Sequence, residues 1–225
     1  MSGLASPWDA RDPHRGQRVA TTGRPLAGAP AAVILVHGRG ASAEGILDLA
    51  ADFDQPGFAY LAPQAYGHAW YPESFLAPLE RNEPGISSGI AVLADLLAQV
   101  GAAGIPPERT FFVGFSQGAC LAAEFAARNA HRGQRLGGIV ALSGGLIGPP
   151  GTPRDYPGSL AGTPVFFGCS DRDPHIPRER VDESARVMAA LGGEVTERIY
   201  PRLGHVVNDD EMELVQDLLA RGTAA

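Results

Sequence analysis

The chain has 225 residues, of which 44% are hydrophobic, enough for one domain with a substantial buried core. Its formal net charge of −7 provides no basic surface, which excludes nucleic acid as a favoured partner. All 18 cationic residues are arginine, and the lack of lysine excludes Schiff-base chemistry and a P-loop lysine.

Residues 1–17 are polar and lack the apolar core of a signal peptide, and no apolar run reaches membrane-spanning length. The two cysteines, Cys120 and Cys169, fall in segments predicted to be buried, so we expect free thiols rather than a disulfide. These features predict a cytoplasmic protein without stable membrane insertion.

The N-terminal segment, residues 1–30, is rich in proline, glycine and arginine, and residues 17–22 within it predict a short edge strand. The continuous apolar run at 31–36 predicts a strand buried on both faces. We expect this strand to open one folded domain that extends over 31–225.

Apolar runs alternate with helix-spaced apolar residues along the rest of the chain. This alternation predicts a single-domain, mostly parallel, doubly wound α/β sheet with helices on both faces. A long irregular segment at 63–84 interrupts it, and such loops are usually functional. Strands are predicted at 31–36, 58–61, 111–113, 138–142, 164–168 and 195–200, and helices at 43–51, 85–100, 119–127, 178–191 and 209–220.

The most informative segment is 110–127, where an apolar run turns through Gly114-Phe115-Ser116-Gln117-Gly118 into an alanine-rich helix. Strand, G-x-S-x-G turn and helix together form the context of a nucleophile elbow. Ser116 would lie on a strained turn, with glycines on both sides so that strand and helix pass closely. A surface Gly-Ser turn is the alternative, but the apolar flanks favour a nucleophile.

Three reactive residues are predicted at the carboxyl ends of strands, where parallel sheets bind ligands. Ser116 follows one strand, Asp173 follows the strand at 164–168, and His205 follows the strand at 195–200. The chain order Ser, Asp, His is that of the α/β-hydrolases. We expect His205 to accept the serine proton and Asp173 to orient the imidazole.

Each of these assignments has an alternative nearby in the chain. Asp171 is a second candidate acid, although the prolines that follow Asp173 fix the loop around the later residue. His175 is a second candidate base, but it adjoins the acid and breaks the expected chain order. Ser143 also ends a predicted strand, but it lacks the G-x-S-x-G frame, so we interpret it as structural.

The loop at 37–42, HGRGAS, is expected to supply one backbone N–H of an oxyanion hole, from Arg39, and Gln117 the other. We expect His37 to brace this loop rather than to react. A phosphate cradle is the alternative, but the loop lacks both the G-x-G-x-x-G frame and a Walker lysine.

Apolar residues of the long loop and of the loop after Asp173 are predicted to form the walls of the acyl or alcohol pocket. Packing in the core is the alternative for such aromatic residues. The other histidines show no metal-ligand spacing, so we expect neither a metal nor another cofactor. The predicted wall residues are Trp70, Tyr71, Phe75 and Ile176.

The motifs VHGRGAS, WYPESF, GFSQGACLA, ALSGGL, SDRDPHIP and GHVVN, in this order and spacing, resemble the phospholipase/carboxylesterase family of α/β-hydrolases. The resemblance covers the chain from about residue 31 to the last helix. It implies hydrolysis of small carboxylic esters or thioesters through Ser116, Asp173 and His205 and an acyl-enzyme, without a cofactor or a large cap domain. Family members often form homodimers.

Two departures from the thioesterase branch of that family bear on the substrate. Arg39 stands where that branch commonly has a small apolar residue, and the WYP loop is more typical of bacterial esterases. The WYP loop argues against lipid-modified proteins as substrates, whereas the Arg39 guanidinium is expected to bear on substrate choice without loss of the backbone donor. A layout without a cap predicts a preference for short acyl groups.

Other functions remain as alternatives to a carboxylesterase. Acyl-protein thioesterase and lysophospholipase activities use the same fold and the same residues. A dienelactone-hydrolase-like enzyme normally has a cysteine nucleophile, which Ser116 counts against. A hydrolase-fold binding module without turnover usually lacks one of the three catalytic residues, and all three are present here.

Overall fold

The computed structural model describes residues 11–53 and 55–222, so residues 1–10 of the predicted N-terminal segment lie outside the described part. Within it, seven strands form one sheet in the order β1-β3-β2-β4-β5-β6-β7. The strands are β1 (Val19–Gly23), β2 (Ala32–Val36), β3 (Ala59–Pro63), β4 (Thr110–Phe115), β5 (Gly138–Leu142), β6 (Pro164–Ser170) and β7 (Glu194–Tyr200). The helices are α1 (Ala43–Leu47), α2 (Leu49–Asp52), α3 (Leu79–Asn82), α4 (Gly85–Ala102), α5 (Gln117–Asn129), α6 (Arg178–Ala190) and α7 (Asp209–Arg221).

All neighbouring strands run parallel except β1, which pairs antiparallel with β3 at the edge of the sheet. This is the mostly parallel, doubly wound α/β sheet that the alternation of strands and helices predicts. The edge strand expected at 17–22 is found at Val19–Gly23. Because it pairs with β3, the sheet extends N-terminal to residue 31.

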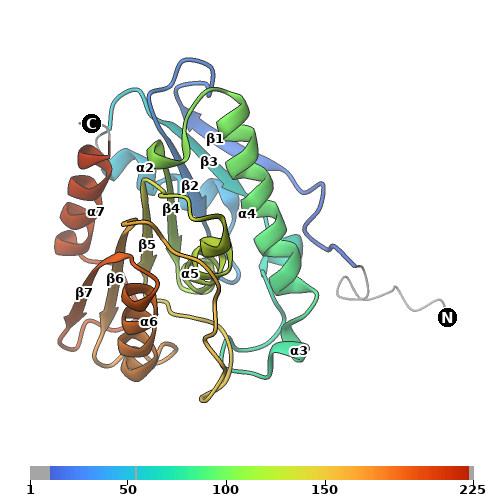
Figure 1. Cartoon of the computed structure of the whole chain (residues 1–225), viewed down its shortest axis with the longest axis vertical. Helices are drawn as coiled ribbons and strands as arrows, with labels where there is room; N and C mark the ends of the chain where they lie inside the picture. Colours follow the sequence, from blue (N-terminus) through green and yellow to red (C-terminus); the bar gives the residue numbers. More distant parts are fainter. Residues whose placement is uncertain (1–10, 54, 223–225) are drawn as a thin grey trace.

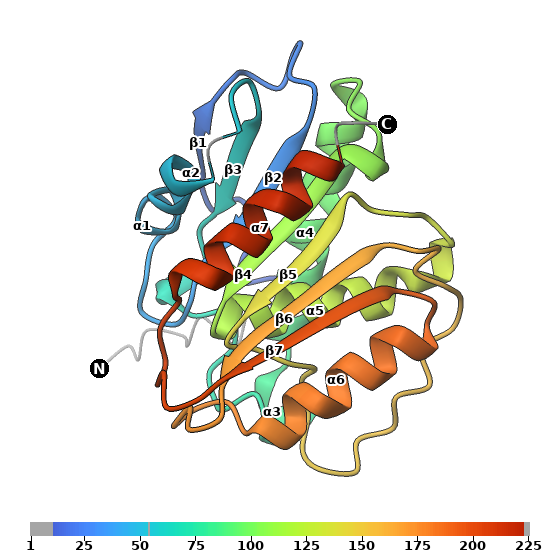
Figure 2. The same ribbon diagram turned by 90° about the vertical axis from the view of Figure 1, so that its left-hand side faces the viewer.

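The central strands are buried on both faces, as their continuous apolar sequences predict. In β2, Ile34 packs into the core beneath α4, α5 and α6, whereas Val33 and Leu35 pack into the core beneath α1 and α7. Burial of one such side chain stabilises the fold by roughly 1.5–3 kcal/mol. Figure 1 shows α4 and α7 on opposite flanks of the sheet, and Figure 2 shows α7 crossing one face with α5 behind the strands.

Two segments between strands differ from the sequence prediction. The single helix expected at 43–51 is divided at Asp48, whose N–H bonds to Ile46 O instead of continuing the helical ladder. The irregular segment at 63–84 contains a single helical turn at Tyr66–His68 and the short helix α3. The remaining strands and helices lie where they were predicted, with ends shifted by a few residues.

Helix α4 is, by length and composition, apolar enough to cross a membrane, which corrects the prediction that no such segment exists. It is the one helix of this kind among residues 11–53 and 55–222. Its buried face, which includes Ile86, Leu93 and Val100, packs into the core of the sheet. In this fold α4 is therefore a core helix.

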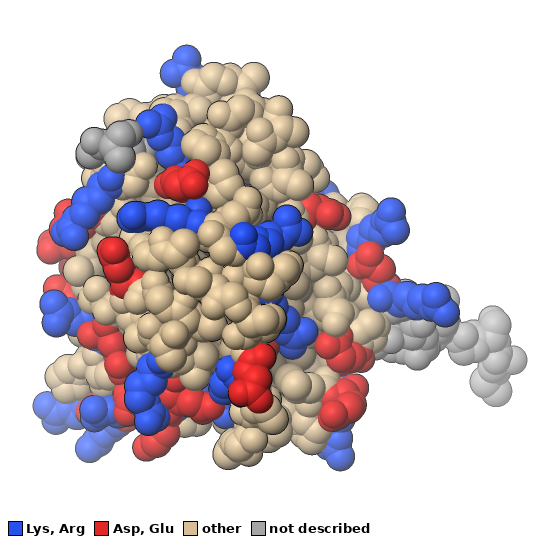
Figure 3. Space-filling model, in the orientation of Figure 1, with Lys and Arg blue, Asp and Glu red and all other residues tan. Residues whose placement is uncertain are grey.

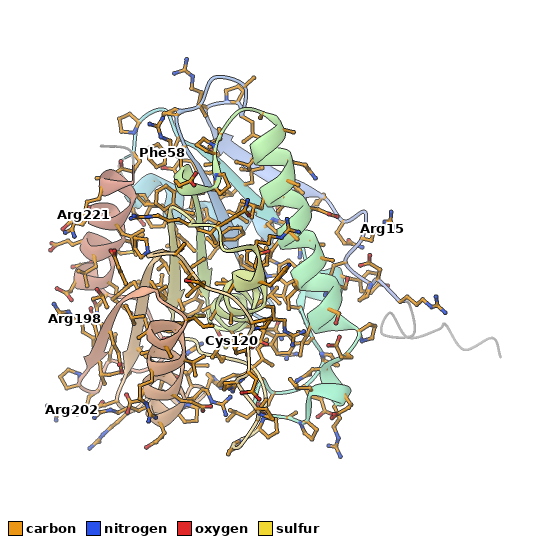
Figure 4. All side chains as sticks on the ribbon, in the orientation of Figure 1. Arg15, Phe58, Cys120, Arg198, Arg202 and Arg221 are labelled. Carbon is orange, nitrogen blue, oxygen red and sulfur yellow. The ribbon has the colours of Figure 1, made fainter. Side chains whose placement is uncertain are left out.

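Charged side chains of both signs are interspersed over the face shown in Figure 3. Both cysteines are buried and unbonded to each other, as predicted. Figure 4 shows Cys120 in the interior on α5, while Arg198, Arg202 and Arg221 lie along the outer side of the molecule.

Candidate active site

Ser116 lies on a sharp turn between β4 and α5, with φ 55° and ψ −118°. An L-residue adopts this conformation only under strain. A Cβ added at Gly114 would overlap the backbone of Gly118, and one added at Gly118 would overlap the carbonyl of Val36. Glycine on both sides therefore lets the strand, the turn and the helix pass closely beside β2, as the motif predicts.

The structure brings Ser116, His205 and Asp173 together at the carboxyl end of the sheet. His205 Nε2 lies 2.8 Å from Ser116 Oγ, and His205 Nδ1 lies 2.7 Å from Asp173 Oδ2. The Asp173 carboxylate accepts a hydrogen bond from the protonated Nδ1. The unprotonated Nε2 is then free to accept a hydrogen bond from the serine hydroxyl. Such an arrangement is able to draw a proton from the hydroxyl and activate its oxygen as a nucleophile.

Asp173 is held as an anion by its hydrogen bonds. Burial alone would raise the pKa of this carboxyl, but the imidazole of His205 and two backbone N–H groups lower the pKa below its ordinary value. Those N–H groups belong to His175 and Ile176 and donate to Oδ1 at 2.8 and 3.0 Å. The side chain of Asp173 is fully buried.

The alternative residues occupy other positions. Asp171 Oδ1 accepts from the N–H of Arg202 at 2.6 Å, so this carboxylate fastens the loop rather than facing the imidazole. The ring of His175 packs edge-on against His205, with the centroids 4.8 Å apart. Ser143 is buried, and its N–H donates to Gly168 O at 2.7 Å.

Neither cysteine is suited to act as the nucleophile. Burial raises the pKa of Cys120 to about 12, and burial together with the charge of Asp173 raises the pKa of Cys169 to about 12. Both thiols therefore stay protonated at neutral pH, and the thiolate is the reactive form. Cys169 Sγ lies 3.8 Å from Asp173 Oδ2, as a weak donor to that carboxylate.

The loop at 37–42 is braced by His37, as expected. Its Nδ1 donates to Gly38 O at 2.7 Å, and its Nε2 accepts from the N–H of Ala65 at 3.1 Å. Burial lowers the pKa of His37, which keeps the ring neutral and able to accept. A Cβ added at Gly38 would lie 3.4 Å from Ser116 Cβ, so the loop packs directly against the elbow.

The N–H groups of Arg39 and Gln117 donate to no protein acceptor within the described residues. Gln117 opens α5, and the first N–H groups of a helix have no intrahelical partner. Both are therefore available to a negative charge that develops beside Ser116.

A cleft of about 410 Å³ opens over Ser116 and His205. Three of the four predicted wall residues, Tyr71, Phe75 and Ile176, line it. Side chains that the sequence did not single out as walls also line it, among them Glu73, Ser74, Phe115, Cys120 and His175.

Trp70 is the exception, and its predicted place on the cleft wall is corrected. It is fully buried and lies outside the lining of the cleft. Its indole N–H donates to His37 O at 2.9 Å, beneath the loop at 37–42. A buried indole needs an acceptor for its N–H, and the carbonyl in the core supplies one. Trp70 is thus a support for the loop.

Among residues 11–53 and 55–222, no group of three or more His, Cys, Asp or Glu side chains is placed to hold a metal ion. A second cavity, of about 600 Å³, lies at the opposite end of the sheet. No serine, histidine or cysteine lines this larger cavity. We therefore assign the candidate active site to the smaller cleft.

A family model described as phospholipase/carboxylesterase matches residues 19–221. The chain belongs to this family. Membership confirms the family predicted from the motifs.

Relatives and solved structures of the family agree with the fold. The chain is 31% identical over 150 residues to acyl-protein thioesterase 1 of Gibberella zeae, across 64% of this chain. The match spans 61% of that relative, less than two thirds of its length. A phospholipase/carboxylesterase structure from Dyadobacter fermentans is 38% identical, covers 91% of this chain and 97% of its own, and superposes with a TM-score of 0.86. The carboxylesterase of Bacillus cereus, 19% identical with a TM-score of 0.71 over 92% of this chain and 95% of its own, shares the fold.

Proposed function

We propose that this chain is a serine carboxylesterase that hydrolyses small carboxylic esters, and thioesters by the same route, through an acyl-enzyme. The observation that carries the proposal is the pair of short contacts at His205, 2.8 Å to Ser116 Oγ and 2.7 Å to Asp173 Oδ2. In this proposal Ser116 is the nucleophile, His205 the general base and acid, and Asp173 the group that orients the imidazole.

The reaction proceeds in two halves. His205 takes the proton of Ser116 as Oγ attacks the acyl carbon, and the N–H groups of Arg39 and Gln117 stabilise the oxyanion. His205 then gives the proton to the leaving alcohol or thiol, and the carbon–oxygen or carbon–sulfur bond breaks. In the second half His205 takes a proton from water, whose oxygen attacks the acyl carbon of the acyl-enzyme. The bond to Ser116 Oγ then breaks, the serine regains its proton from His205, and the carboxylic acid is released. No step draws on a cofactor.

The size of the cleft supports the proposed substrate class. A volume of about 410 Å³ between Tyr71, Phe75 and Ile176 suits a small ester with a short acyl group. We expect faster hydrolysis of p-nitrophenyl butyrate than of p-nitrophenyl laurate; the reverse order contradicts the short-acyl proposal. Acyl-protein thioesterase activity is the second candidate, because a relative from Gibberella zeae carries that name. A series of acyl-CoA and acyl-peptide substrates separates the two.

The decisive experiment replaces the nucleophile. We expect Ser116→Ala to lower kcat on p-nitrophenyl butyrate by about 10⁶-fold, because alanine removes the hydroxyl that bonds to His205 Nε2. Ser143→Ala, at a second strand-end serine, is the matched control and should keep its activity. A fluorophosphonate should phosphonylate Ser116 alone, with release of fluoride, and mass spectrometry should detect the phosphonyl group on that residue. Equal, background-level activity of Ser116→Ala and the unchanged protein contradicts the proposal and leaves a binding function.

We further propose that the enzyme works in the cytoplasm, where its two free, buried thiols fit a reducing compartment. The homodimer expected from the family stays a prediction, and sedimentation of the purified protein tests it.

A further inference from the structure

Residues 70–73, a stretch of irregular chain that we call the rim segment, contribute Tyr71 and Glu73 to the lining of the cleft. Arg39 binds three consecutive carbonyls of this segment. Its Nη2 donates to Tyr71 O at 2.8 Å and to Glu73 O at 2.6 Å, and its Nη1 donates to Pro72 O at 2.9 Å. The guanidinium also lies 6.0 Å from the centroid of the Tyr71 ring. One exposed side chain thus fastens the rim segment from the solvent side.

Gln117 fastens the same segment from the buried side. Its Oε1 accepts from the N–H of Trp70 at 2.8 Å, and its Nε2 donates to Tyr71 O at 2.9 Å. Both ends of the buried amide are therefore satisfied by the rim segment. The Tyr71 carbonyl is the common point, since it accepts from both Gln117 and Arg39.

These two residues are the same two whose backbone N–H groups face the nucleophile in the proposed function. The loop that carries Arg39 and the helix start that carries Gln117 are joined through one carbonyl group. Displacement of either residue is therefore coupled to the position of the other through the rim segment. An oxyanion hole requires a fixed separation between its two N–H groups, because each donor must lie 2.7–3.1 Å from the oxyanion.

We propose that the side chains of Arg39 and Gln117 are positioning residues, which hold the two oxyanion-hole N–H groups at a fixed separation through the rim segment. This inference rests on the proposed function of Ser116 and its partners. It assigns a role to the Arg39 guanidinium, which stands where the thioesterase branch commonly has a small apolar residue.

The chemistry of the contacts favours this role over a simple charge effect. No ion pair within the described residues involves Arg39, and its partners are neutral carbonyls. A planar guanidinium presents several donors in a rigid fork, whereas a lysine ammonium is a single point on a flexible stem. Only the fork reaches three carbonyls of residues 71–73 at once.

The first test compares Arg39→Met and Arg39→Lys with Arg81→Met. Each Arg39 variant keeps a backbone N–H at residue 39, so the proposed oxyanion donor itself is retained. Arg81 is the matched control, because it meets the same segment through the exposed Glu73 carboxylate at 3.7 Å. On p-nitrophenyl butyrate we expect Arg39→Met to lower kcat by roughly 10–100-fold with KM changed less than about threefold. Arg39→Lys should recover part of the loss, and Arg81→Met should stay within about twofold.

A transition-state analogue separates positioning from folding. A trifluoromethyl ketone forms a reversible hemiketal with the serine, and its oxyanion occupies the hole. Its Ki should rise in Arg39→Met by the same factor as kcat/KM falls. The melting temperatures of the Arg39 variants should stay close to that of the unchanged protein, because the side chain is exposed.

The final arm is a double-mutant cycle with Gln117→Met. Because both side chains act on Tyr71 O, the double variant should lose less kcat than the product of the two single losses. Additive losses, a change in KM alone, or an unchanged Ki overturn the inference. Should Gln117→Met fail to fold, the Arg39 variants decide by kcat and Ki. If activity depends on Ser116 but Arg39→Met keeps the kcat and Ki of the unchanged protein, only this inference is overturned. If Ser116→Ala keeps the activity of the unchanged protein, the proposed function is overturned.

Discussion

The two ends of the sheet each carry a cavity, and the smaller one is the candidate active site. At the carboxyl ends of the strands, a cleft of about 410 Å³ is lined by Ser116 and His205. At the amino ends, a cavity of about 600 Å³ is lined by ends of β6, β7 and α7. Size alone would select the wrong end.

The difference follows from the polarity of a parallel sheet. At the carboxyl end, each strand passes into a loop or a helix start, so reactive side chains and unpaired N–H groups converge. At the amino end, the charged side chains are partly paired with each other, as Arg221 with Asp217 at 3.4 Å. A functional site is therefore recognised by converging polar groups with defined partners. Four substitutions test this contrast between the ends.

The largest effect is expected at the orienting carboxylate. Asp173→Asn should lower kcat by about 10⁴-fold, because an amide facing Nδ1 favours the wrong tautomer of His205. Asp171→Asn is the control two residues away, since its carboxylate bonds to Arg202 N–H and not to the imidazole. Steady-state rates on p-nitrophenyl butyrate measure both. Equal losses in the two variants contradict the assignment of Asp173.

The next effect concerns the packing of the elbow. Gly118→Ala should destabilise the fold by about 3 kcal/mol or more, because the new Cβ would overlap the carbonyl of Val36. Gly101→Ala is the control at the other end of the sheet, in α4, where a Cβ meets nothing within 4 Å. That change should stabilise the fold by about 0.5–1 kcal/mol. Urea unfolding measures both, and a neutral Gly118→Ala is incompatible with the close approach of helix and strand.

A smaller effect is expected at Glu211, in the capping box that starts α7. Its Oε2 accepts from the N–H of Asn208 at 3.0 Å, while burial raises the pKa of this carboxyl to about 7. The folded state thus retains a proton that the unfolded chain loses near pH 4.5. The stability that this proton provides is fully present below that pH and is lost as the pH rises through about 7.

Glu211→Gln should remove this pH dependence. The variant should gain on the order of 1–3 kcal/mol over the unchanged protein at pH 8, and match it near pH 4. Asp217→Asn, at the exposed far end of α7, is the control and should change stability by less than about 0.5 kcal/mol. Urea unfolding at several pH values measures the difference. A gain that is equal at both pH values contradicts the buried-carboxyl explanation.

The smallest effect is expected in the larger cavity. Arg135→Ser removes a charged side chain from its lining, and kcat/KM on p-nitrophenyl butyrate should stay within about twofold. A tenfold change in kcat/KM would show that the larger cavity influences catalysis and would contradict the assignment of the active site to the smaller cleft alone.

Local sequence patterns were sufficient for the fold and for the core of the candidate site. The strand at β5 was predicted with its observed ends, because an apolar run bounded by glycine carries its own signal. Ser116 was recognisable for the same reason, since its strained turn requires glycines at fixed spacing. The place of His205 and Asp173 followed from the rule that strand ends meet at one edge of a parallel sheet.

Sequence determined these features because periodicity, turn chemistry and chain order are local or topological properties. Tertiary structure alone decided that Trp70 lies beneath the loop, and that Arg39 and Gln117 grip the rim segment from positions 32 to 47 residues away. The partners there are backbone carbonyls and, for Gln117 Oε1, the backbone N–H of Trp70, groups that almost every residue has. A contact to such a group leaves no mark in the sequence, so only the packed fold reveals which carbonyl a side chain reaches.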